Sequence, residues 1–142
     1  MPLKHRKLIT EGIQQPLELV KFHNAAPFTR RLMAGKALNN NSQKHIAVHE
    51  IRDKLPAEIR NNSVPHAHNC DEWNLILSFD HLLFRIMLED EVYEVEAPAS
   101  IYIPKGLVHS ANVIEGQGFY IAILDCVDYE KSLVEMNPPI LP

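Results

Sequence analysis

The sequence has little cysteine and no long apolar run. Its two cysteines, Cys70 and Cys126, are too few for a disulfide framework, and an intracellular chain would keep them reduced. No run reaches the roughly 18 apolar residues that a membrane helix needs. The basic residues at 1–7 are not followed by an apolar segment, which argues against a secretory signal. We therefore expect a cytoplasmic protein that does not act at a membrane.

Positive charge is also scarce. The 142 residues include 14 Lys and Arg against 18 Asp and Glu, which gives a formal net charge of −4. A mildly acidic chain without a basic block is poorly suited to nucleic acid, so we expect no nucleic-acid partner. The hydrophobic share of 46% is typical of a folded globular protein. The length fits one domain with a core of its own.

The pattern along the chain predicts an all-β fold. From residue 45, apolar and polar residues alternate in short runs that are separated by turn residues, which is typical of a sandwich or barrel. No strand–helix alternation is present, so a parallel α/β sheet is disfavoured. The predicted strands cover 45–51, 72–78, 82–88, 92–96, 100–103, 108–114 and 119–125.

These patterns divide the chain into three parts. Residues 1–44 lack a clean period and are predicted to form an N-terminal arm that packs on the barrel or on a partner subunit. Residues 45–128 form the predicted barrel. Residues 129–142 are a C-terminal tail with room for one or two helical turns before its prolines stop the helix.

Three of the eight histidines have the spacing of a metal site. His66 and His68 are two residues apart, so on a strand they point to the same face, and Glu72 follows with the same parity. His109 comes at the start of a later predicted strand. Three imidazoles and a carboxylate suit one divalent transition metal ion (Fe, Mn, Ni, Co, Cu or Zn) and leave coordination positions open.

The two motifs that carry these residues resemble those of the cupin superfamily. The first is His66-x-His68-x-x-x-Glu72, and the second is Pro104-x-Gly106-x-x-His109. The resemblance covers roughly residues 63–125. It implies a double-stranded β-helix (jelly-roll) barrel, with the N-terminal arm in front of it, and His66, His68, Glu72 and His109 as metal ligands. Family members often carry an Asn four residues after the last histidine, whereas Asn112 lies three residues after it and would turn to the other face of a regular strand.

Other residues are weaker candidates for the site. Glu72 is the predicted catalytic residue, because a carboxylate can stay a ligand or accept a proton. Arg85 and Tyr102 are candidate substrate-binding residues. Cys70 is read as a small core residue. His45, His49 and His81 are not expected to be ligands, although His49 could line the barrel from an adjoining strand. Trp73, Leu75 and Leu77 form an apolar stripe that faces away from the metal.

The function is predicted only by class. The first hypothesis is a metalloenzyme acting on a small polar metabolite, such as a sugar derivative or a carboxylate, by isomerase, lyase or dioxygenase chemistry. The alternative is a barrel that binds or senses a small molecule without turnover. A purely structural dimer scaffold is a third reading. We expect a homodimer, because cupins commonly pair through the outer sheet and the arm.

Overall fold

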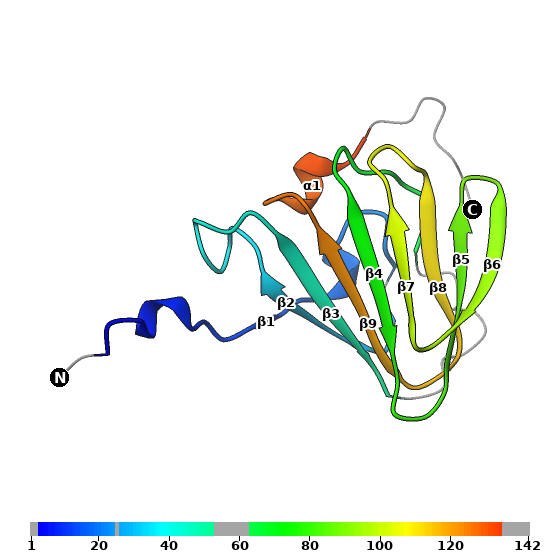
Figure 1. The fold of residues 1–142 in the computed structure, drawn as a ribbon, viewed down its shortest axis with the longest axis horizontal. Coiled ribbons are helices and arrows are strands. Elements are labelled where there is room, and N and C mark those ends of the chain that lie inside the picture. Colours follow the sequence, from blue (N-terminus) through cyan, green and yellow to red (C-terminus); the bar gives the residue numbers. More distant parts are fainter. Residues whose placement is uncertain (1–2, 25, 53–62, 135–142) are drawn as a thin grey trace.

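The computed structural model describes residues 3–24, 26–52 and 63–134, and these residues form two antiparallel sheets (Figure 1). The larger sheet has the strand order β1-β2-β3-β9-β4-β7, and the smaller has the order β6-β5-β8. The strands of the larger sheet are β1 (Ile13–Gln14), β2 (Thr29–Ala34), β3 (His45–Ile51), β4 (Glu72–Leu77), β7 (Ala99–Ile103) and β9 (Gly118–Leu124). Those of the smaller sheet are β5 (Leu82–Leu88), β6 (Glu91–Glu96) and β8 (His109–Gly116).

Helical structure is short. The described helices are two 3₁₀ turns, η1 (Arg6–Leu8) and η2 (Leu17–Leu19), and one α-helical turn, α1 (Tyr129–Ser132). Among the described residues, no helix has the length and apolar character needed to cross a membrane. The all-β prediction is confirmed, and α1 supplies the helical turn predicted for the tail; residues 135–142 of that tail lie outside the described part of the chain. The two sheets are not closed into one continuous barrel.

Alternation within the strands decides which side chains enter the space between the sheets. In β3 every second residue is buried, starting from His45, so His45, His49 and Ile51 point inward. In β4 the inward residues are Glu72, Asn74 and then Ile76. The inward face is therefore polar where β4 begins and apolar where it ends.

The apolar end of the molecule is its hydrophobic core. The core side chains come from both sheets and hold them together, and burial of each large aliphatic side chain contributes about 2 kcal/mol. They are Ile51, Ile76, Leu82, Phe84, Ile86 and Val113. The polar side chains at the other end of the same strands are left to form a site.

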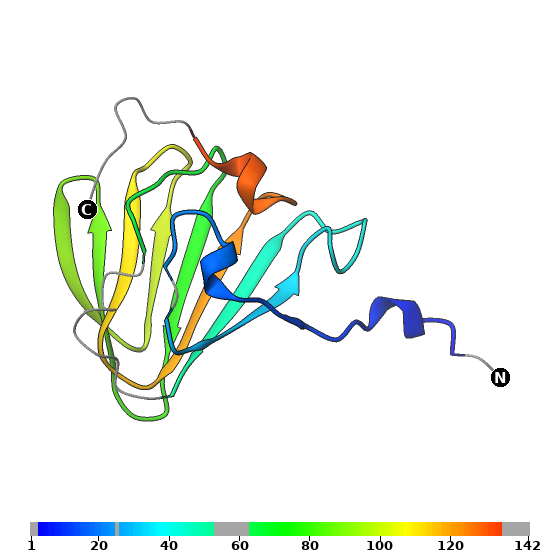
Figure 2. The ribbon, with the colours of Figure 1, turned by 180° about the vertical axis from the view of Figure 1, so that it is seen from behind.

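The N-terminal segment only partly behaves as an arm. Residues 3–12 are exposed and extend away from the sheets (Figures 1 and 2). Strand β2, by contrast, pairs along β3 from Thr29↔Glu50 to Ala34↔Ile46 and is an integral part of the larger sheet. Between β1 and β2, η2 lies in front of the larger sheet in the view of Figure 2.

Candidate metal centre

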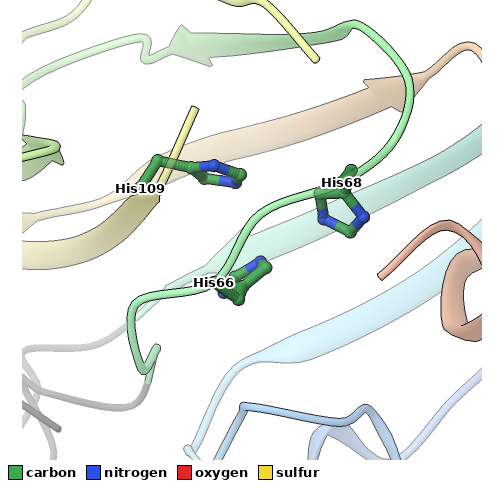
Figure 3. Close-up of side chains that lie close together, drawn as sticks. All are labelled: His66, His68 and His109. Atoms are coloured by element: carbon green, nitrogen blue, oxygen red, sulfur yellow. The ribbon is translucent and has the colours of Figure 1, made fainter. Parts of the chain in front are cut away.

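The predicted ligands converge at the polar end of the sandwich. His66 and His68 lie on the segment that leads into β4, Glu72 is the first residue of β4, and His109 is the first residue of β8. One ring nitrogen from each histidine lies within 4.8 Å of those of the other two (Figure 3). All four residues are buried, with exposed fractions of 5% or less. We call these four residues the metal centre.

Backbone pairing fixes the histidine segment in place. His66 and His109 form an antiparallel bridge in which each backbone N–H donates to the other's carbonyl, at 3.0 and 2.9 Å. His68 forms a second bridge, with Leu133 after α1. The two histidines thus lie in an extended segment that a bend at Asn69 and Cys70 separates from β4, rather than on one continuous strand with Glu72. Both nevertheless face the same space.

Each imidazole is held by a hydrogen bond at Nδ1. The acceptors are the Val64 carbonyl for His66 (2.6 Å), the Leu107 carbonyl for His109 (3.0 Å) and Ser132 Oγ for His68 (2.7 Å). The Ser132 hydroxyl donates its own hydrogen to the Tyr129 carbonyl at 2.6 Å, so it can only accept from His68. This arrangement places the hydrogen on Nδ1 and leaves Nε2 available as a metal ligand.

Glu72 directs one carboxylate oxygen into the same space. Its Oε1 accepts a hydrogen bond from Asn74 Nδ2 at 2.8 Å, and Asn74 Oδ1 accepts one from the Tyr120 hydroxyl at 2.6 Å. Its Oε2 lies 3.0 Å from His109 Nε2 and 3.7 Å from His68 Nε2. These three atoms are buried and make no hydrogen bond of good geometry with the described residues. Buried polar atoms that face one another in this way are suited to a shared metal ion.

The charges of the centre agree with that reading. Burial lowers the pKa of His66 to about 3 and that of His68 to about 4, so both rings are neutral. Burial alone would raise the pKa of Glu72, but its contact with His109 and the other imidazole interactions lower it to about 2. Burial also disfavours a charged His109, yet the Glu72 carboxylate more than offsets this and raises its pKa. His66, His68 and Glu72 therefore have the forms that a divalent metal requires, neutral imidazole and ionised carboxylate, whereas any proton on His109 Nε2 has to leave when a metal binds.

The metal centre opens into a narrow cavity of about 40 Å³. One water molecule needs roughly 10–15 Å³ of such volume, so the cavity admits only a small ligand unless side chains move. His49 lines this cavity, as one reading of the sequence allowed, but several other cavity residues were not foreseen as parts of a site: His23, Arg30, His45, Tyr120 and Tyr129. Alternation in the strand 45–51 could have placed His45 and His49 on the inner face. No comparable periodicity marked His23 or Arg30.

The two predicted substrate-binding residues lie elsewhere. Arg85 is exposed on β5, and Tyr102 is 46% exposed on β7, so neither lines the cavity. Side chains alternate between the two faces of a strand. Phe84 and Ile103 point inward, so their neighbours Arg85 and Tyr102 point outward. Neither side chain is therefore placed to contact a ligand in the cavity beside the metal centre.

Asn112 and Cys70 also lie outside the cavity and interact with nearby residues. The Asn112 side chain bonds both backbone groups of Ser63, at 2.8 and 3.1 Å, on the face of β8 away from the cavity. Cys70 is partly buried, and burial together with the neighbouring Cys126 thiol raises its pKa to about 12. Trp73 points away from the metal centre, as its parity predicted, and is 45% exposed.

Comparison with known proteins adds the fold family. No family model and no curated protein matches the sequence. Among solved structures, KdgF from Halomonas sp. has a TM-score of 0.52 at 16% identity, over 79% of this chain and 85% of its own. The polyketide cyclase RemF from Streptomyces resistomycificus has a TM-score of 0.52 at 16% identity, over 87% and 79%. A cupin 2 domain-containing protein from Halorhodospira halophila has a TM-score of 0.51 at 13% identity, over 69% and 63%. The chain therefore has the cupin fold that its two motifs predicted.

Proposed function

We propose that this protein is a metal-dependent enzyme that acts on a small polar metabolite. The observation that carries the proposal is the metal centre: one ring nitrogen from each of three buried histidines lies within 4.8 Å of the other two, and Glu72 Oε2 lies beside Nε2 of His68 and His109. Nδ1 of every imidazole is already bonded to an acceptor. Four protein ligands leave coordination positions for a substrate. One of the fold neighbours, RemF, is named as a cyclase, which supports a catalytic role for this type of cavity.

The chain supplies two groups for proton transfer and orientation. A divalent metal at this site would polarise a substrate oxygen, or bind dioxygen if it is Fe(II). Glu72 Oε2 is ionised and can accept a proton from the substrate. Burial raises the pKa of the Tyr129 hydroxyl, so this group remains a hydrogen-bond donor; it lies 3.3 Å from His66 Nε2. Isomerase, lyase and dioxygenase reactions all fit these groups.

Metal analysis tests the centre directly. Protein purified without a metal-affinity tag is expected to carry close to one transition-metal ion per chain, and His66→Ala or His109→Ala is expected to lower that content at least tenfold. His81→Ala is the matched control, because His81 lies in a half-exposed turn between Glu96 and Glu115. Wild-type protein that takes up no added Fe(II), Mn(II), Co(II), Ni(II), Cu(II) or Zn(II) would disprove the site.

Turnover distinguishes an enzyme from a binding module. Oxygen consumption by the Fe(II)-loaded protein with candidate substrates tests for oxygenase chemistry, and product analysis with Zn(II) or Ni(II) tests for isomerase or lyase chemistry. Glu72→Gln is expected to retain part of the bound metal and lose turnover. A ligand that binds tightly and is returned unchanged would instead support a sensing protein.

We also propose that two copies pair through the outer face of the larger sheet. Trp73 and Leu77 on β4 are 45% and 44% exposed, and the Trp73 ring lies 5.0 Å from that of Tyr102 on β7. The register continues this apolar surface onto β9, where Ile121 and Ile123 stand beside Leu75 and Trp73. The exposed segment 3–12, which extends away from its own sheets, is available to contact a second copy.

Light scattering after size exclusion tests the dimer. We expect the wild-type mass to be twice that of the chain and Trp73→Glu to give a monomer that keeps its metal, because a buried unpaired carboxylate opposes association. Val92→Glu is the control, since Val92 is exposed on β6 of the smaller sheet. A monomeric wild type would disprove the pairing. The cytoplasmic location stays a prediction from the sequence.

A further inference from the structure

Arg30 is a buried cation that has no carboxylate beside it. Its side chain enters the cavity from β2 and is 4% exposed. Among the residues that the structure describes, no carboxylate oxygen lies within 4.0 Å of its nitrogens. Buried charges in folded proteins are usually paired, so an unpaired guanidinium in a cavity calls for a ligand of opposite charge.

The groups that hold Arg30 are neutral acceptors. Its Nε donates to Gln15 Oε1 at 2.9 Å, Nη1 to His49 Nε2 at 2.7 Å and Nη2 to His45 Nε2 at 3.4 Å. His49 Nδ1 in turn donates to the Tyr120 carbonyl at 3.0 Å, which is consistent with a lone pair on Nε2. These bonds orient the guanidinium and use three of its five N–H groups, which leaves two for a ligand.

The two histidines cannot supply a compensating charge. Burial, followed by the nearby Arg30 charge, lowers the pKa of His45 to about 4 and that of His49 to about 3. Glu72 is already engaged by Asn74 and His109 in the metal centre. The positive charge of Arg30 is therefore not balanced by the described residues around it.

Arg30 and the metal centre share one cavity. The lining includes Arg30, His66, Glu72 and His109. Tyr129 also lines this cavity, with its ring centroid 5.7 Å from that of His45, a partner of Arg30, and 6.3 Å from that of His66. A small molecule can therefore contact Arg30 with one end while the other end faces the metal centre.

From this geometry we infer that Arg30 binds a carboxylate group of the substrate, so that the cavity selects small organic acids. A planar carboxylate matches two parallel N–H donors of a guanidinium, and the narrow cavity favours it over a bulkier tetrahedral anion. This inference rests on the proposed function, because it names the class of substrate for the same cavity. It gives Arg30 a specificity-determining role that the sequence pattern had suggested for Arg85.

Calorimetric titration with small acids tests the inference. The probes are acetate, glycolate and oxalate, their neutral amides, and inorganic phosphate, each titrated into metal-free and metal-loaded protein. We expect at least one carboxylate to bind at least tenfold more tightly than its amide and than phosphate. This comparison uses wild-type protein and therefore does not depend on the stability of a variant.

Two variants at one position and a control at the next assign the effect to Arg30. Arg30→Gln is expected to weaken carboxylate binding at least tenfold with unchanged metal content, and Arg30→Lys to restore part of the loss. Arg31→Gln is the matched control, because Arg31 pairs with Glu50 at 3.3 Å on the outer face of β2. It should bind like the wild type.

The outcomes separate this inference from the proposed function. Carboxylate binding that depends on Arg30 in protein that takes up no metal would retain the anion site and disprove the metalloenzyme. Normal metal content with no binding of any carboxylate, with equal binding of the amides or phosphate, or with undiminished binding in Arg30→Gln would overturn the anion site alone.

Discussion

At the scale of single residues, the metal centre depends on groups behind its ligands. Asn74 is fully buried and joins Glu72 to the Tyr120 hydroxyl through two short hydrogen bonds. These hydrogen bonds occupy Glu72 Oε1 and leave Oε2 directed at the imidazoles of His68 and His109. Such partners of a ligand typically change metal affinity by about 10- to 100-fold when they are removed.

We therefore expect Asn74→Ala to weaken metal binding by about tenfold or more, because the carboxylate loses the bond that orients it. Competition of the protein with a chromophoric chelator for Zn(II) measures the change. Tyr120→Phe removes the more distant bond and should have a smaller effect. Leu75→Ala, on the other face of the same strand, is the control; an affinity loss equal to that of Asn74→Ala would mean that only the stability of β4 had been measured.

At the scale of elements, the hairpin between β8 and β9 depends on a glycine that has no space for a side chain. Gly116 has φ +99°, and a Cβ built on it would lie 2.0 Å from the His81 carbonyl oxygen. Gly106, in the loop before β8, also has a positive φ of +86°, but no atom lies within 4 Å of its Cβ position. Substituting each glycine in turn therefore separates the cost of crowding, expected only at Gly116, from the cost of backbone strain, expected at both.

Gly106→Ala is expected to lower the free energy of unfolding by about 1–2 kcal/mol, the cost of a left-handed backbone. Gly116→Ala should cost about 3 kcal/mol or more, since the contacting atoms belong to the backbone and cannot turn aside. Urea unfolding of the two variants measures the difference. Equal losses would contradict the close approach of the hairpin to His81.

Comparison of the predicted strands with the observed ones shows which elements could be predicted from the sequence and which could not. Alternation and turn residues predicted β3 and β5 at their observed bounds. The two motifs contain three histidines, and the fold brings these together. Strand β2 was not predicted at its bounds, because residues 1–44 show no clean period and were expected to form only short strands or a helical turn. The fold shows that Arg30 points inward and Arg31 outward. Contacts between distant segments, such as Arg30 with His49, depend on strand order, which no local pattern specifies.

At the scale of the whole molecule, the polar half of the interior contains many neutral histidines. Four of them are buried, and burial lowers their pKa values to between about 3 and about 4; they are His45, His49, His66 and His68. A histidine in the unfolded chain titrates near 6.5. Between these values the unfolded state binds more protons than the folded state, so acid favours unfolding.

The free energy of unfolding of the metal-free protein is therefore expected to fall as the pH falls below about 6.5. The contribution of the buried neutral histidines is fully present only above that pH. Between pH 7 and pH 5.5 each of these four histidines contributes a loss of about 1 kcal/mol, whereas the fifth buried histidine, His109, acts in the opposite sense because Glu72 raises its pKa. Urea unfolding at a series of pH values, in protein freed of metal by a chelating resin, measures the slope. His49→Gln should reduce the slope of stability against pH by close to one proton. His81→Gln should steepen it. The two glutamate partners of the half-exposed His81 raise its pKa, so His81 stabilises the folded state in acid and its removal has the opposite effect. A free energy of unfolding that stays constant from pH 7 to pH 5.5 would mean that these imidazoles are not held neutral inside the sandwich, and it would remove the electrostatic basis for both the metal centre and the unpaired charge of Arg30.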